Sequence, residues 1–158
     1  DIMYGMSASF RYKNFTLSAD LQGVYGNEVW RDWGNGSTFA QFNYRTDRLN
    51  AWNGPGTSNW EPAVSSRPIN RLPSTYGIED GSFLRVRNLQ IGYNISPDAL
   101  RKVKIKSFRI FANAQNLKTW KRNSGYTPEF GGSPTQFGID NGNGPIPVVF
   151  TGGINVNF

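Results

Sequence analysis

The first part of the chain alternates between apolar and polar side chains with a period of two. One face of residues 2–12 carries Ile2, Tyr4, Met6, Ala8, Phe10 and Tyr12. The other face carries Met3, Gly5, Ser7, Ser9 and Arg11. This pattern predicts a β-strand with one apolar face. Residues 15–25 repeat it after the dipeptide Lys13-Asn14, so the two segments are predicted to form an antiparallel hairpin with a two-residue turn.

Three later segments, 83–95, 108–120 and 147–158, show the same alternation and are predicted as strands. In the first of them, the far end is polar, and Arg85 and Arg87 fall on the otherwise apolar face. Each of the five strands has about ten residues or more, close to the 9–11 of a tilted membrane-spanning strand. Ser, Thr, Asn, Gln and Asp recur on the second face, as expected where strands line a polar lumen.

The predicted connections differ greatly in length. The turn at residues 13–14 is minimal, whereas residues 26–82 and 121–146 form long loops. Alternation of short turns with long loops is typical of outer-membrane barrels, in which the long loops are extracellular. Five strands cannot close a barrel, and an open edge in lipid leaves backbone groups unsatisfied. The remaining strands are therefore expected from elsewhere. Within residues 97–106, one helical turn is a weaker expectation.

Composition supports an all-β chain without catalytic chemistry. Aromatic residues make up 15% of the sequence, with 18 Gly and 9 Pro, a mixture typical of β-rich chains with long loops. Cysteine and histidine are both absent, which removes thiol nucleophiles, the usual zinc sites and the commonest general base. The net charge of +6 is spread over loops and strand ends without forming a stripe, so nucleic acid is not an expected partner.

The chain boundaries and hydropathy bear on the location of the protein. No apolar run approaches the roughly 20 residues of a membrane helix, whereas a barrel span remains possible. The sequence starts with Asp1 inside a predicted strand and shows no signal peptide, so the natural N-terminus is expected upstream.

Four motifs in the second half give the chain a family resemblance. Residues 80–93, DGSFLRVRNLQIGY, resemble the "G-x-F-x-R-x-x-N-x-x-x-G-Y" stretch of SusC/RagA TonB-dependent outer-membrane transporters. Residues 114–120, AQNLKTW, are similar to their "Q-N-L-x-T-W" strand, and residues 125–129, GYTPE, to "G-Y-D-P-E". The chain ends in GINVNF, like "G-x-N-V-x-F". Thr127 replaces the usual Asp, and Val149 stands where the family often has a charged residue.

The resemblance implies a large transmembrane β-barrel of about 22 strands with a plug in its lumen. The chain would supply the last five antiparallel strands, while the plug and the N-terminal domains lie outside it. The implied partners are the remainder of the barrel, a SusD-like surface lipoprotein, the TonB complex and the lipid of the outer membrane of a Bacteroidetes-type bacterium. The implied substrates are oligosaccharides or peptides, and no cofactor is implied.

Candidate contact residues are aromatic. The long first loop contains Trp30, Trp33, Trp52 and Trp60 among Asn, Gly and Arg residues, and the second contains Tyr126. Exposed rings of this kind stack on sugars, but they could equally form a small core of the loop or contact a lipoprotein partner. At the C-terminus, Phe150, Ile154, Val156 and Phe158 share one face and resemble the signal by which assembly machinery recognises a last strand.

Other polar clusters are weaker candidates. Glu28 with Asp32, and Glu79 with Asp80, are carboxylate pairs best interpreted as solvated loop charges. Residues 140–144, DNGNG, resemble a calcium loop only loosely because the closing Glu of an EF-hand is missing. Two alternatives to a transporter remain open at this point: a soluble carbohydrate-binding β-sandwich, and a structural or secretion-linked barrel.

Overall fold

The computed structural model describes residues 1–32, 46–64, 72, 74–96, 105–130 and 133–158. The chain divides into two compact units. The first unit comprises residues 1–27, 81–122 and 145–158, and the second comprises residues 28–80 and 123–144. Each unit contains its own β-sheet.

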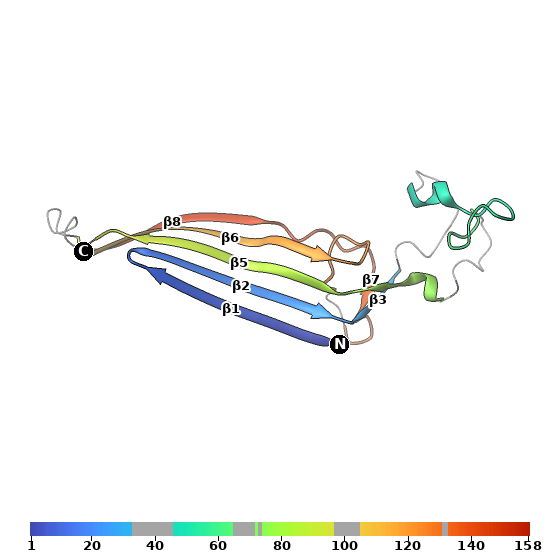
Figure 1. Ribbon diagram of the computed structural model, residues 1–158, viewed down its shortest axis with the longest axis horizontal. Helices are drawn as coiled ribbons and strands as arrows, with labels where there is room; N and C mark the ends of the chain where they lie inside the picture. Colours follow the sequence, from blue (N-terminus) through green and yellow to red (C-terminus); the bar gives the residue numbers. More distant parts are fainter. Residues whose placement is uncertain (33–45, 65–71, 73, 97–104, 131–132) are drawn as a thin grey trace. The chain divides into compact units, whose positions relative to one another are not determined.

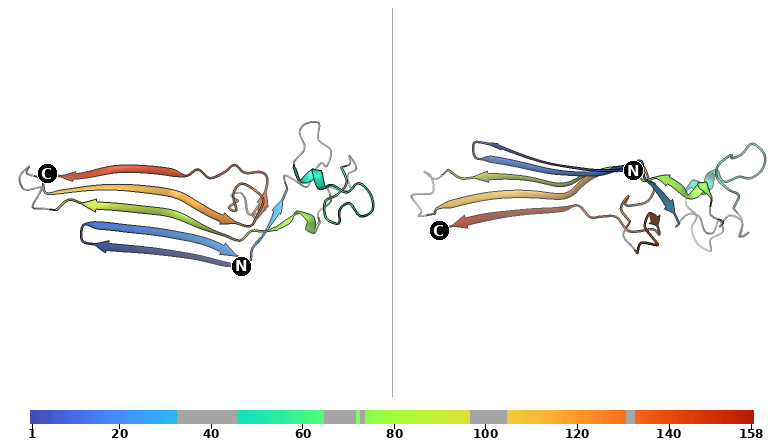
Figure 2. Two further views of the ribbon diagram at one scale, coloured as in Figure 1. Left: turned by 45° about the horizontal axis from the view of Figure 1, so that its top comes forward. Right: turned by 90° about the horizontal axis from the view of Figure 1, so that it is seen from below.

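The first unit is a five-stranded antiparallel sheet. Its strands are β1 (Ile2–Tyr12), β2 (Phe15–Tyr25), β5 (Phe83–Asn94), β6 (Ser107–Lys121) and β8 (Val149–Asn157). They lie side by side in the order β1-β2-β5-β6-β8, with β1 and β8 at the two edges (Figures 1 and 2). The strands have 9 to 15 residues, longer than the five or six usual in globular sheets. The all-β fold class is thereby confirmed.

A tight turn joins β1 to β2. Tyr12 pairs with Phe15, which leaves Lys13 and Asn14 as the two turn residues. Lys13 adopts a left-handed conformation with φ of 51°, as two-residue hairpin turns require. The Asn14 carbonyl oxygen then accepts a hydrogen bond from the backbone N–H of Asn94, so the turn is also attached to β5.

The register divides the sheet into an apolar face and a polar face. Residues that pair directly across neighbouring strands form rows that run across the sheet. The apolar face is built from rows such as Phe10–Leu17–Ile91–Ala112–Gly152. The polar face is built from rows such as Ser9–Ser18–Gln90–Asn113–Thr151. Because paired residues on neighbouring strands point to the same side of a sheet, each of these rows lies on one face across all five strands.

One irregularity in β5 changes which residues belong to each face. Asp20 pairs with Asn88 but Leu21 pairs with Val86, so Arg87 is an extra residue in β5. This β-bulge shifts the alternation by one residue. Arg85 therefore pairs with Gln22 on the polar face, and Arg87 donates a hydrogen bond to Gln22 Oε1 over 2.9 Å. The expectation that both arginines lie on the apolar face is wrong, because an unbroken alternation ignores the bulge.

Very little apolar surface is buried within the described residues. The buried hydrophobic residues there are Val29, Phe83 and Ala114. Large apolar side chains on the apolar face are instead exposed, and Phe10 and Phe150 expose 66% and 73% of their surface. A contiguous exposed apolar surface of this kind indicates contact with another apolar phase or partner.

The second unit contains short elements from both predicted long loops. Its strands are β3 (Glu28–Arg31), β4 (Ile78–Asp80) and β7 (Ile139–Asp140), ordered β4-β3-β7. Among the described residues, the 3-10 helices η1 (Thr46–Asn50) and η3 (Thr75–Gly77) lie between β3 and β4 in sequence. In the part of the chain that the structure describes, no helix has the length and hydropathy to cross a membrane. The helical turn expected within residues 97–106 falls mainly outside the described residues.

Candidate functional site

The polar face of the first unit carries an arginine pair near the ends of β2 and β5 that lead into residues 26–82. Arg85 is 4% exposed, and its Nε donates to Thr119 Oγ1 over 2.8 Å. Arg87 is exposed and is oriented by its bond to Gln22. The β5 bulge therefore brings two guanidinium groups to the same place on this face.

A second arginine pair lies near the opposite end of the same strands. Arg11 of β1 pairs with Thr16 of β2. Arg109 of β6 donates from Nη2 to Thr16 Oγ1 over 3.2 Å, so it reaches across the intervening strand β5. This crossing requires Gly92 of β5, because a Cβ there would lie 2.7 Å from both Arg109 Nη2 and Thr16 Oγ1.

The residues between these pairs are mostly uncharged. Asp20 accepts a hydrogen bond from Asn88 Nδ2 over 3.2 Å, and Ser18, Gln90 and Asn113 continue the polar surface. Asp20 is the single acidic residue in the five strands. The sequence alone did not reveal this gathering of arginines, because it depends on the bulge at Arg87 and on the pairing of strands distant in sequence.

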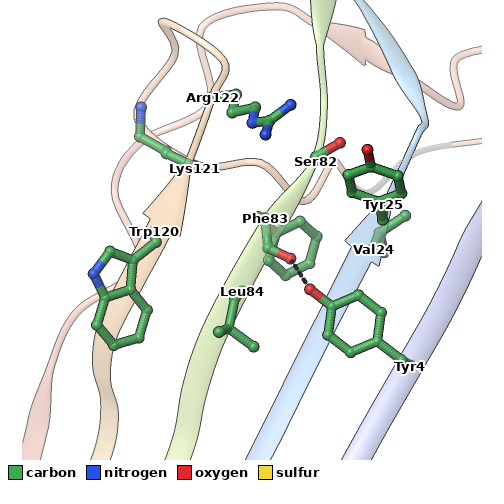
Figure 3. Close-up of a pocket in the computed structure, with 9 residues that line it drawn as sticks. All are labelled: Tyr4, Val24, Tyr25, Ser82, Phe83, Leu84, Trp120, Lys121 and Arg122. Carbon is green, nitrogen blue, oxygen red and sulfur yellow. Dashed lines mark hydrogen bonds between the residues drawn. The ribbon is translucent and has the colours of Figure 1, made fainter.

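The apolar face carries aromatic side chains close to the strand ends that lead into the second unit. Figure 3 shows Tyr4, Leu84 and Trp120 around a shallow hollow in this region, with Lys121 and Arg122 at the end of β6. Tyr4 Oη donates to the Phe83 carbonyl oxygen over 3.2 Å. Trp120 is 52% exposed and pairs with Leu84. Exposed amphipathic rings at strand ends suit a membrane–water interface.

The four residues of the predicted assembly signal lie on or immediately after the edge strand β8. Phe150, Ile154 and Val156 pair with apolar-face residues of β6, and Phe158 follows the last paired residue. Phe150, Ile154 and Phe158 are 73%, 62% and 79% exposed. The structure thus brings three exposed apolar residues and the half-buried Val156 together at the end of the chain, and their role as a signal stays a prediction.

The second unit joins two loops that are far apart in sequence. Trp30 and Arg31 of β3 pair in parallel with Ile139 and Asp140 of β7. Around this sheet, Glu79 forms an ion pair with Arg31 over 3.3 Å and accepts hydrogen bonds of 2.7 Å from the Ser124 backbone N–H and hydroxyl. The interpretation of Glu79 as a solvated loop charge is therefore wrong.

A tyrosine holds part of the first loop in place. Tyr76 Oη donates to Glu61 Oε2 over 2.7 Å, and Arg48 pairs with the same carboxylate over 3.5 Å. The Arg31 guanidinium lies 5.2 Å from the centre of the Tyr76 ring. Burial first, and then the hydrogen bond to Glu61, raise the pKa of Tyr76 above its ordinary value. Sequence offers no signal for this cluster, because its members lie far apart along the chain.

Two of the aromatic contact candidates share one segment. Trp52 donates its backbone N–H to the Glu61 carbonyl oxygen over 3.1 Å, which closes residues 52–61 into a loop. Trp60 packs against Tyr76 with ring centres 5.7 Å apart. Trp52 and Trp60 are nevertheless 46% and 66% exposed, so both rings remain accessible to a ligand or partner.

The other aromatic candidates are placed differently. Trp30 is half-buried in β3, where its backbone N–H donates to the Gly138 carbonyl oxygen over 2.8 Å. Tyr126 is 72% exposed in the segment that follows β6. Trp33 lies outside the described residues. Trp30 thus has a structural role in the small sheet, while Tyr126 resembles Trp52 and Trp60 in its exposure.

In residues 140–144, which loosely resemble a calcium loop, the acidic side chain is hydrogen-bonded within the segment. Asp140 is 2% exposed, and its Oδ1 accepts a hydrogen bond from the Gly142 backbone N–H over 2.9 Å. Its other oxygen occupies the space that a side chain at Gly125 would need. Within the described ranges, no group of three or more His, Cys, Asp or Glu side chains is placed to hold a metal ion.

The soluble-sandwich alternative requires a second sheet large enough to cover the apolar face. The other described sheet has strands of only four, three and two residues. Such a sheet is too small to cover five strands of 9 to 15 residues. The exposed apolar face therefore favours a membrane strand set over a sandwich.

Comparison with known proteins agrees with this arrangement. No protein-family model matches the chain. Over its full length the chain is 31% identical to TonB-dependent receptor P3 of Formosa agariphila, spanning 16% of that protein. It is likewise 28% identical to TonB-dependent receptor SusC of Bacteroides thetaiotaomicron, spanning 15%. Throughout its length the chain is thus similar to TonB-dependent receptors of the SusC type.

Solved structures support the same assignment at the level of fold. The chain superposes on a chain of the RagAB peptide importer in the open-open state with a TM-score of 0.81 and 24% identity, covering 99% of this chain and 17% of that one. The closed-closed state gives 0.80 and 23%. In fold the chain corresponds to part of the barrel of these proteins, which are named as receptors and an importer.

Proposed function

We propose that this chain forms the last five strands of an outer-membrane barrel that imports oligosaccharides or peptides. The observation that carries the proposal is the five-stranded sheet with one continuous exposed apolar face and one polar face. Lipid would cover the apolar face and the polar face would line the lumen, since these are the two environments of a transmembrane barrel strand.

Open sheet edges support the participation of further strands. Within the described residues, β1 and β8 each pair with one other strand, so their outer backbone groups would need a second partner in lipid. Each unsatisfied backbone group costs several kcal/mol there, which favours closure into a barrel of about 22 strands around a plug. This chain spans 16% of a relative's length, and in this proposal the plug and the other strands would lie in the rest of the protein.

The second unit would then be extracellular, since it is built from long connections whereas the β1–β2 turn has two residues. Exposed Trp52, Trp60 and Tyr126 would contact a substrate or a SusD-like lipoprotein lid. One solved relative is the RagAB peptide importer, which favours a lidded importer over a purely structural or secretion-linked barrel. Energy would come from the TonB complex through the plug-bearing part.

The test is isolation of the native polypeptide that contains this chain from an outer-membrane fraction, followed by its intact mass and the identification of copurifying proteins. A detergent-soluble protein much longer than 158 residues, with a plug and a lipoprotein partner, is expected. Deletion of its gene should abolish uptake of the oligomer it imports. A short protein in the soluble fraction would contradict the proposal, and a long barrel without a plug would favour the secretion-linked alternative.

A further inference from the structure

We infer that the polar face selects oligomers that carry carboxylate or sulfate groups. The inference rests on the proposed function, in which this face lines the substrate path. It concerns the charge class of the substrate, which follows from how arginines are distributed over the face.

The first anion-binding position is the pair Arg85 and Arg87. Arg85 is nearly fully buried and is held by Thr119, whereas Arg87 is exposed beside Gln22. Guanidinium groups remain charged at any physiological pH and bind planar anions through several N–H groups. The buried Arg85 therefore supplies a permanent positive charge. The exposed Arg87 supplies N–H groups that a passing anion can reach.

The second position is the pair Arg11 and Arg109 on either side of Thr16. Arg109 is fixed over Gly92 by its bond to Thr16, and its buried Nε has no hydrogen-bond partner within the described residues. A buried donor without a partner is costly, so an acceptor from outside these residues is favoured there. Arg11 is exposed at the neighbouring strand position.

The two positions are separated by a short and almost uncharged stretch. Thr16 and Gln22, which mark them on β2, are six residues apart in the strand. This corresponds to about 20 Å along the face. Asp20 between them is bonded to Asn88, and no other acidic residue occurs in the five strands. Four arginines against one carboxylate give the face a positive potential along most of its length.

A positive lining favours anions because a lumen with low-dielectric walls concentrates the field of its charges. An oligomer with several acidic groups can contact one arginine pair before it leaves the other. A neutral oligomer gains no such attraction, and a cationic one is repelled. Acidic peptides and acidic glycans share this chemistry.

The experiment uses the full-length transporter with its copurifying partner. It is incubated with two oligomer pools, a protein digest and a digest of mixed neutral and acidic polysaccharides. Mass spectrometry then compares the charge of retained and input oligomers. We expect the retained oligomers to be more acidic than the input. If they come from the protein digest, the substrates are acidic peptides, and if they come from the polysaccharide digest, the substrates are acidic glycans.

The variant for this assay is Arg11→Gln with Arg87→Gln, which removes two exposed charges and leaves the buried Arg85 and Arg109 in place. The matched control is Lys13→Gln with Lys118→Gln, because Lys13 lies in the β1–β2 turn and Lys118 at an apolar-face position. We expect the arginine variant to lower acidic enrichment about two- to five-fold, as for partly exposed ion pairs. The lysine control should retain it.

If the retained oligomers have the same charge distribution as the input, the inference about charge is overturned, whereas the proposed import function still stands. Equal losses of acidic and neutral oligomers in the arginine variant would also overturn it, since they would indicate a structural role for these residues. Retention of no oligomer from either pool would instead count against the proposed function itself.

Discussion

Tyr4 on β1 donates a hydrogen bond to the carbonyl oxygen of Phe83 on β5, 3.2 Å away and across the whole width of β2 (Figure 3). The ring can reach so far because Gly23 of β2 lies beneath it. A Cβ at Gly23 would collide with the phenol ring and its oxygen. A glycine in one strand thus allows an aromatic side chain to connect its two neighbours.

Substitution Gly23→Ala is expected to displace Tyr4 and destabilise the sheet. The loss combines one hydrogen bond with local overpacking, about 1–3 kcal/mol in total. In the full-length barrel it should lower the temperature at which the band shifts from folded to unfolded mobility in heated gel samples. Gly5→Ala is the matched control, because its Cβ would meet only the Leu21 carbonyl oxygen at an ordinary 3.6 Å. Equal shifts in both variants would contradict the explanation.

Gly92→Ala should displace the Arg109 guanidinium from Thr16. The new Cβ would lie within 2.8 Å of two guanidinium nitrogens and of the Thr16 hydroxyl, so at least one of these groups must move. We expect a loss of about 1–3 kcal/mol, measured as a lower unfolding temperature of the full-length protein. Gly152→Ala, which meets nothing closer than 3.9 Å, should have little effect. The prediction fails if Gly152→Ala is as destabilising.

Glu79→Gln should loosen both loops of the second unit at once. The change removes the ion pair with Arg31 and weakens the bonds from Ser124, at a local cost of about 1–3 kcal/mol for these partly buried groups. Hydrogen exchange in the full-length protein should rise in residues 74–80 and also in residues 123–130. Glu28→Gln, at an exposed position of β3, serves as the control. A rise confined to residues 74–80 would show that Glu79 does not connect the loops.

Tyr76 gives the second unit a dependence on alkaline pH. Its pKa is raised in the folded state, chiefly by burial, above the ordinary 10.0. Its contribution to stability is therefore complete below pH 10 and is lost as pH rises through the folded pKa. The difference between ultraviolet titrations of the native protein and Tyr76→Phe isolates this one phenol. Its midpoint is expected above that of a free tyrosine, and a midpoint at or below that value would contradict the partly buried hydrogen bond to Glu61.

Phe158→Ala should reduce the amount of folded barrel in the outer membrane several-fold if the terminal aromatic is an assembly signal. The suitable control is Phe137→Ala, because both phenylalanines are 79% exposed but Phe137 lies in the second unit. Quantification of heat-modifiable protein in outer-membrane fractions measures the effect. Similar levels for the two variants would remove Phe158 from the proposed signal.

The alternation of apolar and polar residues along the chain was sufficient to predict the all-β class. The unequal lengths of the connections between predicted strands were sufficient to suggest an outer-membrane barrel. Residues 2–12 and 15–25 show why, since side-chain direction in a strand depends on local geometry with a period of two. Where the pattern is uninterrupted, as in Met6 opposite Leu21, the sequence also predicts the face of each residue.

The positions that depend on contacts between distant segments required the tertiary structure. The extra residue Arg87 reverses the face of Arg85, and this reversal is visible only when β5 is paired with β2. The link between Glu79 and Ser124 joins segments 45 residues apart. The sequence also does not distinguish the exposed Trp60 from the half-buried Trp30, because both lie in the same predicted loop.

The sequence by itself determined the five long strands and, wherever the alternation is unbroken, their apolar and polar faces, because each strand's pattern is local. The tertiary structure alone decided which charges meet on the polar face and which loop residues form ion pairs. The physical reason is that register, bulges and glycine crossings set these contacts, and all three are properties of paired strands rather than of any one segment.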